Sequence, residues 1–268
     1  MSRVARALLA VIAAALLCGC GSDAEDLANP PGATVQDFDV ESRAVGRDMP
    51  VRFLVPGGRP RLRPMLVFLH GRGDDADTYA DESLLEVLDD LGDRAPVVAL
   101  PDGGDDSYWH DRADADWARY VMDEVIPQVA ALGGADRDRV AIGGISMGGF
   151  GAYDLARLYP DRFCAVGGHS PALWRTAGET APGAFDDAED FARHDVIAGA
   201  EALAGIPVWL DAGDRDPFLP GDEAFLAALE AAGADVTAHT WPGGHDRDYW
   251  DRHWEDYLEF YADELERC

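Results

Sequence analysis

Residues 139–160 have the sequence "RVAIGGISMGGFGAYDLARLYP" and indicate the fold class of this chain more clearly than any other stretch. It opens with an apolar run, "RVAIGG", of the kind found in strands that are buried on both faces of a sheet. It closes with residues 148–159, whose composition and spacing are typical of a helix. The turn between them is rich in glycine and holds one serine, Ser146. Strand, tight turn and helix in this order are characteristic of an α/β sheet.

The rest of the chain repeats this alternation. Short apolar runs predict strands at 34–43, 49–55, 65–70, 95–101, 139–144, 164–170, 206–213 and 235–241. Helix-like segments lie at 81–91, 117–132, 148–159, 195–203, 222–232 and 247–265. We therefore predict an α/β fold with a mostly parallel eight-stranded sheet and helices on both faces. Ligands of such sheets bind beyond the carboxyl ends of the strands, so the loops after the strands should carry the chemistry.

The serine lies in a G-x-S-x-G pattern formed by residues 144–148. Such a turn holds the serine hydroxyl above the sheet in a strained backbone conformation. Gly144 and Gly148 avoid the clash that a Cβ would make with the neighbouring strand and helix. Because a strand precedes the pattern and a helix follows it, we predict Ser146 as a nucleophile rather than part of a glycine-rich packing turn. A serine hydroxyl then needs a histidine base, and the base needs an acid to orient it.

The stretch "LDAGDRDPF", at the end of the strand at 206–213, contains three aspartates that are candidates for the acid. Asp211 is expected within the strand itself, and Asp214 is expected to shape the turn that follows Gly213. Asp216, three residues past that glycine, has the reach to orient a histidine. We predict Asp216 as the acid, with Asp214 as the alternative and a surface turn as the purely structural explanation of either.

His245 is the predicted base, because it lies in the loop "WPGGHDRDYW" directly after the last strand. His239 is expected inside that strand and His253 inside the last helix, where a structural role is more common. His169 ends the strand at 164–170, and we predict it to be a pocket residue close to the site. The order Ser146, Asp216, His245 is that of α/β-hydrolases.

An oxyanion formed at this site needs two backbone donors. We predict the N–H groups of Met147, directly after the serine, and of Arg72, in the glycine-flanked loop "HGRG" after the strand at 65–70. The aspartates of the same loop are interpreted as solvated charge rather than a cation site. No pair of cysteines or histidines has the spacing of metal ligands, so we predict no metal, and the chemistry requires no cofactor.

The first residues have the composition of an export signal: Arg3 and Arg6, an apolar stretch over 7–17, and small residues with cysteine. The end "LCGC" resembles a bacterial lipobox, which implies cleavage before Cys20 and attachment of lipid to its thiol. Ordinary signal-peptide cleavage is the alternative. We expect a signal at 1–19, a flexible tether at 20–33 and a single domain at 34–268, exported and lipid-anchored on the extracytoplasmic side of a bacterial membrane.

Composition narrows the range of partners. The chain of 268 residues carries 51 acidic and 22 basic residues, a formal charge of -29, which argues against binding to nucleic acid. Under the predicted processing only Cys164 and Cys268 remain to form a bridge; just ahead of a strand, where Cys164 lies, a small buried apolar residue is the more frequent role.

Six stretches together resemble the esterase family of α/β-hydrolases, which includes S-formylglutathione hydrolase, feruloyl and enterochelin esterases and the secreted mycolyltransferases. They are "LHGRGDDADTY", "PDGGDDSYWHD", "GGISMGGFGAYDLARLYPDRF", "GGHSPALW", "GDRDPF" and "GGHDRDYW". The resemblance implies an ester substrate, the residues assigned above, and a cleft lined by Tyr108 and Trp109 with Trp174 beside it; core packing is the alternative for these aromatics. It also implies two alternatives to hydrolysis: acyl transfer to a sugar or alcohol, and a binding lipoprotein that keeps only the scaffold.

Overall fold

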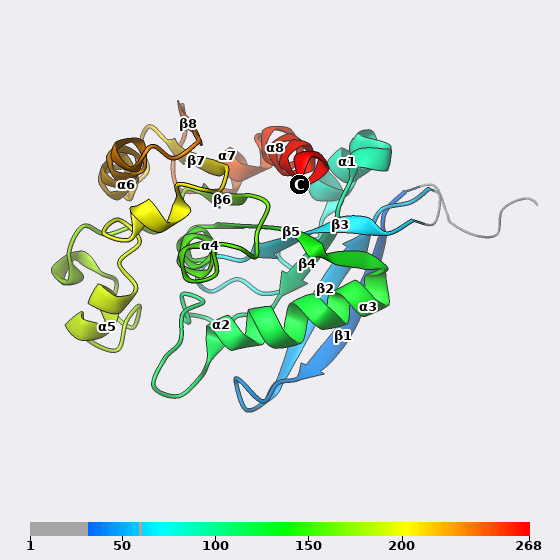
Figure 1. Cartoon of the computed structure of the whole chain (residues 1–268), viewed down its shortest axis with the longest axis horizontal. Helices are drawn as coiled ribbons and strands as arrows, with labels where there is room; N and C mark the ends of the chain where they lie inside the picture. Colours follow the sequence, from blue (N-terminus) through cyan, green and yellow to red (C-terminus); the bar gives the residue numbers. More distant parts are fainter. Residues whose placement is uncertain (1–31, 59–60) are drawn as a thin grey trace, which may run out of the picture.

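A computed structural model describes residues 32–58 and 61–268, so the predicted signal and most of the tether lie outside the described residues. These residues form one eight-stranded sheet in the order β1-β2-β4-β3-β5-β6-β7-β8 (Figure 1). The strands are β1 (Thr34–Glu41), β2 (Asp48–Val55), β3 (Arg63–Leu69), β4 (Val97–Pro101), β5 (Ala135–Ile145), β6 (Val166–His169), β7 (Val208–Gly213) and β8 (Val236–Trp241). Pairing is antiparallel from β1 to β2 and from β2 to β4, and parallel across the other strands, which confirms the predicted fold class.

Helices cover both faces of this sheet (Figure 1). They are α1 (Glu82–Leu91), α2 (Trp117–Arg119), α3 (Ile126–Gly133), α4 (Met147–Leu158), α5 (Ala188–Arg193), α6 (Leu219–Ala232), α7 (Arg247–Asp251) and α8 (Trp254–Arg267). Helices α1 and α8 lie side by side on one face, while α3 and α4 lie on the other (Figure 1). Each face therefore has a separate apolar core.

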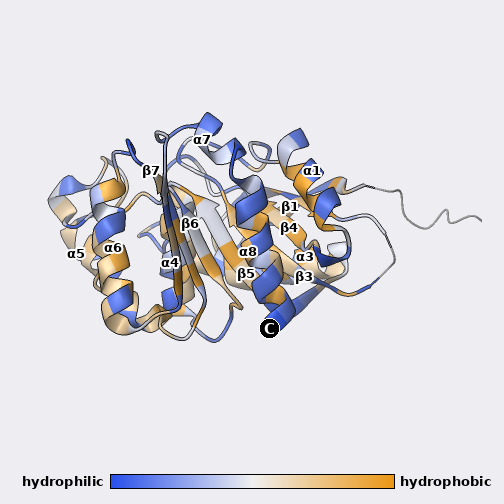
Figure 2. Ribbon diagram, turned by 90° about the horizontal axis from the view of Figure 1, so that it is seen from above, coloured by the Kyte–Doolittle hydropathy of each residue, from blue (hydrophilic) through white to orange (hydrophobic). Residues whose placement is uncertain are grey.

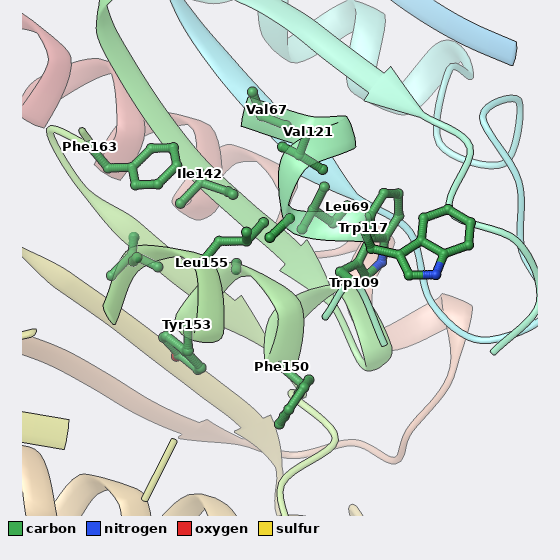
Figure 3. Packing of buried hydrophobic residues seen from close by; sticks show 14 of the residues in the cluster. Val67, Leu69, Trp109, Trp117, Val121, Ile142, Phe150, Tyr153, Leu155 and Phe163 are labelled. Atoms are coloured by element: carbon green, nitrogen blue, oxygen red, sulfur yellow. The ribbon is translucent and has the colours of Figure 1, made fainter. Parts of the chain in front are cut away.

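The larger core lies between the sheet and helices α3 and α4, and includes Trp109, Phe150 and Tyr153 (Figure 3). The smaller core lies under α1 and α8 and includes Phe68 and Trp254. Strand β3 is buried along its whole length because it serves both cores. In Figure 2 the interior strands are largely orange, whereas the outward sides of the helices are blue. The acidic residues thus lie mainly at the surface.

Three expected helices differ from the observed ones. The helix expected at 195–203 is wrong: only a 3₁₀ turn at Ala200–Leu203 forms there, and α5 ends before it. The helix expected at 247–265 is two helices, α7 and α8, and His253 is the N-cap of α8 rather than a residue inside a helix. The helix expected at 117–132 is continuous but contains a π-helical segment at Tyr120–Val125. Apolar spacing alone does not mark such breaks, since it persists through them.

A disulfide joins Cys164 and Cys268, which are 104 residues apart in sequence. It ties the end of α8 to the chain just before β6. Of the two roles left open for Cys164, the structure therefore selects the bridge. Among the described residues no helix has both the length and the apolar character needed to cross a bilayer.

Candidate active site

Ser146 occupies the turn between β5 and α4, with φ 55° and ψ −114°. A non-glycine residue at positive φ is strained and persists only where its surroundings enforce it. Here a Cβ on Gly144 would lie 2.5 Å from the carbonyl carbon of Gly148, and a Cβ on Gly148 would overlap the carbonyl oxygen of Leu69. Gly144 therefore lets β5 lie close to α4, and Gly148 lets α4 lie close to the end of β3, so that the Ser146 side chain stands at the carboxyl edge of the sheet.

His245 lies between Ser146 and Asp216. Its Nε2 is 2.9 Å from Ser146 Oγ, and its Nδ1 is 2.8 Å from Asp216 Oδ2. The carboxylate can only accept, so Nδ1 carries a proton and Nε2 is free to accept from the serine hydroxyl. The Asp216 side chain is fully buried, whereas the imidazole remains 20% exposed. The three residues that the sequence singled out are thus in hydrogen-bond contact.

Two neighbouring loops place the acid and the histidine relative to each other. Asp216 Oδ1 accepts a hydrogen bond of 2.8 Å from the N–H of Phe218, which fixes the carboxylate. Asp214 Oδ1 accepts from the N–H of Gly243 at 3.0 Å, two residues before His245. Asp214 therefore joins the two loops and does not contact the imidazole, in agreement with its expected role in the turn.

A second buried carboxyl lies close to Asp216. Asp222, in the first turn of α6, is buried and neither of its oxygens has a hydrogen-bond partner among the described residues. Burial, together with the negative charges of Asp216 and Asp211, raises the pKa of Asp222 well above its ordinary value. The two carboxyls therefore differ in environment, because Asp216 has hydrogen-bond partners and Asp222 has none among the described residues.

Met147 is the first residue of α4, where a backbone N–H has no partner within the helix. The loop after β3 approaches the same place: a Cβ on Gly71 would lie 3.5 Å from the Cβ of Ser146. The N–H of Gly73 donates to the Asp105 carbonyl at 3.0 Å, which fixes the loop directly after Arg72. The geometry therefore brings both predicted donor segments to the serine.

His70 braces this loop, and sequence reasoning missed it. Its Nε2 accepts from the N–H of Gly103 at 2.8 Å, so its Nδ1 donates to the carbonyl of Gly71, also at 2.8 Å. Burial lowers the pKa of His70 and keeps the ring neutral, as this double contact requires. Its position directly before "GRG" was the only signal in the sequence.

The Arg72 side chain lies towards the segment that follows β6. The guanidinium group donates a hydrogen bond of 3.1 Å to the carbonyl of Pro182 and also donates one to the Tyr108 hydroxyl. Tyr108 packs on Trp174 with ring centroids 5.4 Å apart, and Trp174 packs on Phe218 at 5.6 Å. An aromatic row thus runs from Phe218, which packs on the triad histidine, to Tyr108. Tyr108 and Trp174 are 2% and 9% exposed and belong to the larger core, in agreement with the alternative of core packing, and their contact with a substrate stays a prediction.

Two predicted pocket residues do not line a pocket. His169 and Trp109 are fully buried, with 0% exposure. Trp109 is part of the larger core and donates its indole N–H to the carbonyl of His70 (Figure 3). The prediction was wrong for both because each ring is covered by parts of the chain that are distant in sequence, which the local sequence does not reveal.

Instead, His169 belongs to a buried polar network beneath the site. Its Nδ1 is 2.8 Å from Asp211 Oδ1, and its Nε2 is 2.9 Å from the Tyr261 hydroxyl. Asp211 also accepts hydrogen bonds from Trp209, Tyr249 and Tyr257. Burial lowers the pKa of His169 despite the neighbouring Asp211, so the ring is neutral. The network ties β6, β7, α7 and α8 together directly behind the catalytic loops.

The sheet order and the strained serine turn define the class of fold, that of the α/β-hydrolases. Solved structures support this. A ferulic acid esterase aligns with 88% of this chain and 100% of its own at a TM-score of 0.78 and 20% identity. S-formylglutathione hydrolase from Agrobacterium tumefaciens aligns with 89% of this chain and 99% of its own at a TM-score of 0.78 and 19% identity.

Within that class, the chain belongs to the esterase family: the family model described as "Putative esterase" matches residues 42–260. Esterase Rv1288 of Mycobacterium tuberculosis is 24% identical over 250 residues, which cover 78% of this chain and 55% of the relative. Diacylglycerol acyltransferase/mycolyltransferase Ag85B of Mycolicibacterium smegmatis is 30% identical over 191 residues, which cover 63% of this chain and 55% of the relative. The chain spans about half the length of these curated relatives.

Proposed function

We propose that this protein is a serine hydrolase that cleaves carboxylic esters through a Ser146, His245, Asp216 triad. One observation carries the proposal: His245 contacts the Ser146 hydroxyl with one ring nitrogen and the buried Asp216 with the other. Membership of the esterase family supports ester cleavage as the reaction.

In the proposed reaction, His245 Nε2 takes the hydroxyl proton of Ser146 as the serine oxygen attacks the ester carbonyl. Asp216 holds the imidazole in the required tautomer and stabilises the imidazolium that forms. The imidazolium then protonates the leaving alcohol, which leaves an acyl-enzyme on Ser146. Water, activated by the same histidine, releases the acid and restores the serine. No step requires a cofactor.

The tetrahedral intermediate carries a negative charge on the former carbonyl oxygen. The proposed donors to this oxygen are the N–H groups of Met147 and Arg72. The N-terminal end of α4 favours negative charge at the same place through its aligned peptide dipoles. Each such donor typically contributes about 10² to 10³ to turnover.

Labelling with a fluorophosphonate probe tests the nucleophile. We expect the wild type and a Ser83→Ala control to label equally, because Ser83 lies in α1, a helix that carries none of the triad residues. We expect Ser146→Ala not to label. Absence of labelling in the wild type would favour the alternative of a binding lipoprotein, and equal labelling of Ser146→Ala would contradict the assignment.

The segment 171–193 is the only insertion predicted over the site, and Ser146 and His245 both keep partial exposure. We therefore expect a fairly open cleft that accepts bulky esters, and a screen of an ester library tests this. A complete failure to turn over bulky esters, with small ones cleaved, would contradict an open cleft.

Acyl transfer is a second candidate reaction, because one relative is named a diacylglycerol acyltransferase/mycolyltransferase. The same residues would form the acyl-enzyme, and a sugar or alcohol would replace water as the acceptor. Product analysis with and without added acceptors distinguishes hydrolysis from acyl transfer. Hydrolysis leaves the acyl group as the free acid, whereas transfer gives a new ester with the added acceptor.

We further propose that the protein is exported and anchored by lipid on Cys20. The support is the sequence of residues 1–20, with its basic start, apolar stretch and lipobox-like end. Membrane fractionation of bacteria that express the wild type or Cys20→Ser tests it. We expect the wild type in the membrane fraction and the variant to lose lipid incorporation; ordinary cleavage would leave both chains without lipid.

A further inference from the structure

Away from the triad, three buried side chains that are distant in sequence face one another. His110 follows the aromatic pair Tyr108-Trp109, while Asp190 lies in α5 and His194 directly follows it. Their exposures are 0%, 0% and 8%, and one side-chain nitrogen or oxygen of each lies within 4.8 Å of the others. We call these three residues the His110 cluster. The spacing of these residues along the sequence does not indicate the cluster, because 80 residues separate His110 from Asp190.

The separations suit the coordination of a metal ion. His110 Nε2 lies 3.1 Å from Asp190 Oδ2, and His194 Nε2 lies 3.8 Å from Asp190 Oδ1. Ligands at the usual zinc distances of about 2.0 to 2.1 Å lie about 3.3 Å apart in a tetrahedral site. The two separations involve different oxygens of Asp190 and lie on both sides of this value, so small rotations of the side chains would bring both imidazoles and the carboxylate to one ion.

Hydrogen bonding fixes the state of His194. Its Nδ1 is 2.8 Å from Asp154 Oδ2, and Asp154 is itself paired with Arg157. Since the carboxylate only accepts, Nδ1 of His194 carries the proton and, in the neutral ring, Nε2 presents a lone pair to Asp190. Two electron-pair donors then face each other at 3.8 Å, longer than a hydrogen bond, and a cation between them would relieve the repulsion. A histidine held by a carboxylate through its other nitrogen is also the usual outer shell of a zinc ligand.

The charges around the cluster are consistent with a bound cation. Arg193 currently contributes positive charge, since it donates to Asp190 Oδ1 at 2.9 Å. Its side chain is 58% exposed and can move to solvent when an ion takes this oxygen.

We propose that His110, Asp190 and His194 form a binding site for one Zn²⁺ ion. Two imidazoles and one carboxylate are a donor set that zinc accepts, and water or the second oxygen of Asp190 would complete four ligands. The ion would join α5 to the segment after Tyr108, and through Asp154 to α4, the helix that begins at Met147. Its role would be to fix the insertion beside the serine, without taking part in the reaction.

Metal content tests the proposal directly. The full-length chain, free of any polyhistidine tag, is equilibrated with Zn²⁺ and desalted. Its zinc content is then measured by inductively coupled plasma mass spectrometry. We expect about one zinc per chain in the wild type and less than a fifth of that in His110→Asn and in His194→Asn. The second variant keeps an amide N–H that can still donate to Asp154. His239→Asn is the matched control, because His239 lies in β8 outside the cluster, and should retain zinc.

Two measurements on the wild type keep the test independent of how the variants fold. Saturating Zn²⁺ should raise the thermal midpoint by about 5 to 10 °C, and EDTA should reverse the increase. Co²⁺ in place of zinc should give the visible absorption of a four-coordinate site. A wild type that retains no zinc, or variants that retain as much as the wild type, would overturn the proposal.

Discussion

Two histidine–aspartate pairs lie at the carboxyl edge of the same sheet. In both, Nδ1 of the ring is 2.8 Å from a fully buried carboxylate: His245 with Asp216, and His169 with Asp211. They differ at the second nitrogen. Nε2 of His245 contacts the Ser146 hydroxyl, and the His245 side chain is 20% exposed. Nε2 of His169 contacts the Tyr261 hydroxyl, and the His169 side chain is fully enclosed.

The comparison shows that a hydrogen-bonded pair of this kind does not by itself make a catalytic base. The base also needs a partner that can lose its proton to a substrate, and space for that substrate. Ser146 meets both needs, because its strained turn holds the hydroxyl at the edge of the sheet. Tyr261 meets neither, because burial raises the pKa of its hydroxyl well above the ordinary value and its ring lies in the smaller core. We call His245 with Asp216 the open pair and His169 with Asp211 the enclosed pair. We expect changes in the open pair to lower activity and changes in the enclosed pair to lower stability.

The largest effect is expected from His245→Ala, which removes the base of the open pair. The loss in kcat should be about 10⁶-fold, comparable to loss of the nucleophile. The thermal midpoint should stay close to that of the wild type, since the ring is partly exposed. Initial rates on p-nitrophenyl acetate and calorimetry on the same sample check both. A loss below about 10²-fold would contradict the role of base.

The next effect separates the two carboxylates. Asp216→Asn should lower kcat by about 10⁴-fold at neutral pH, because an amide can hold the imidazole in the wrong tautomer. Asp211→Asn, the matched change in the enclosed pair, should instead lower the free energy of unfolding by about 3 to 5 kcal/mol, since it disrupts a buried network with four donors. Urea unfolding and rates at a temperature where both variants are folded test this. The same outcome for both changes would remove the distinction.

Loss of the disulfide is expected to lower stability and not turnover, because the bridge anchors α8, which supplies Tyr257 and Tyr261 to the enclosed pair. Closing a loop of 104 residues restricts the unfolded chain by about 4 to 5 kcal/mol. The double variant Cys164→Ser, Cys268→Ser should lose most of this stability but keep its kcat at temperatures where it is folded. A thermal midpoint that is insensitive to dithiothreitol in the wild type would contradict the expectation.

The smallest effect is the dependence of stability on pH. Burial lowers the pKa of His169 below 6.5, so the unfolded chain takes up this proton first as the pH falls. The contribution of neutral His169 to stability is therefore complete above pH 6.5 and is lost below it, at about 1.4 kcal/mol for each pH unit down to the folded-state pKa. Urea unfolding at pH 5 and 7.5 measures the slope. A His169→Gln variant should show a shallower one; an unchanged slope would assign the effect to other groups.

Much of the sheet and of the triad geometry follows from local sequence signals. Apolar runs locate the interior strands β3, β4, β6 and β7 because strands that are buried on both faces exclude polar residues. Ser146 is recognisable because only glycine fits on either side of so tight a turn. The breaks at His253 and at the 3₁₀ turn of 200–203 were missed, since they depend on packing rather than on residue spacing.

The class of fold, the glycines that permit the turn, and the serine, acid and histidine in their order can be recognised in the amino-acid sequence, because each is marked by its immediate neighbours. Which histidine is open and which is enclosed depends on the packing of the folded chain, since burial of His169 requires Tyr257 and Tyr261, about 90 residues away. The same packing brings Cys164 to Cys268, and His110 to Asp190 and His194. Contacts of this kind are set by how helices pack on the sheet, and a local stretch of sequence carries no record of that packing.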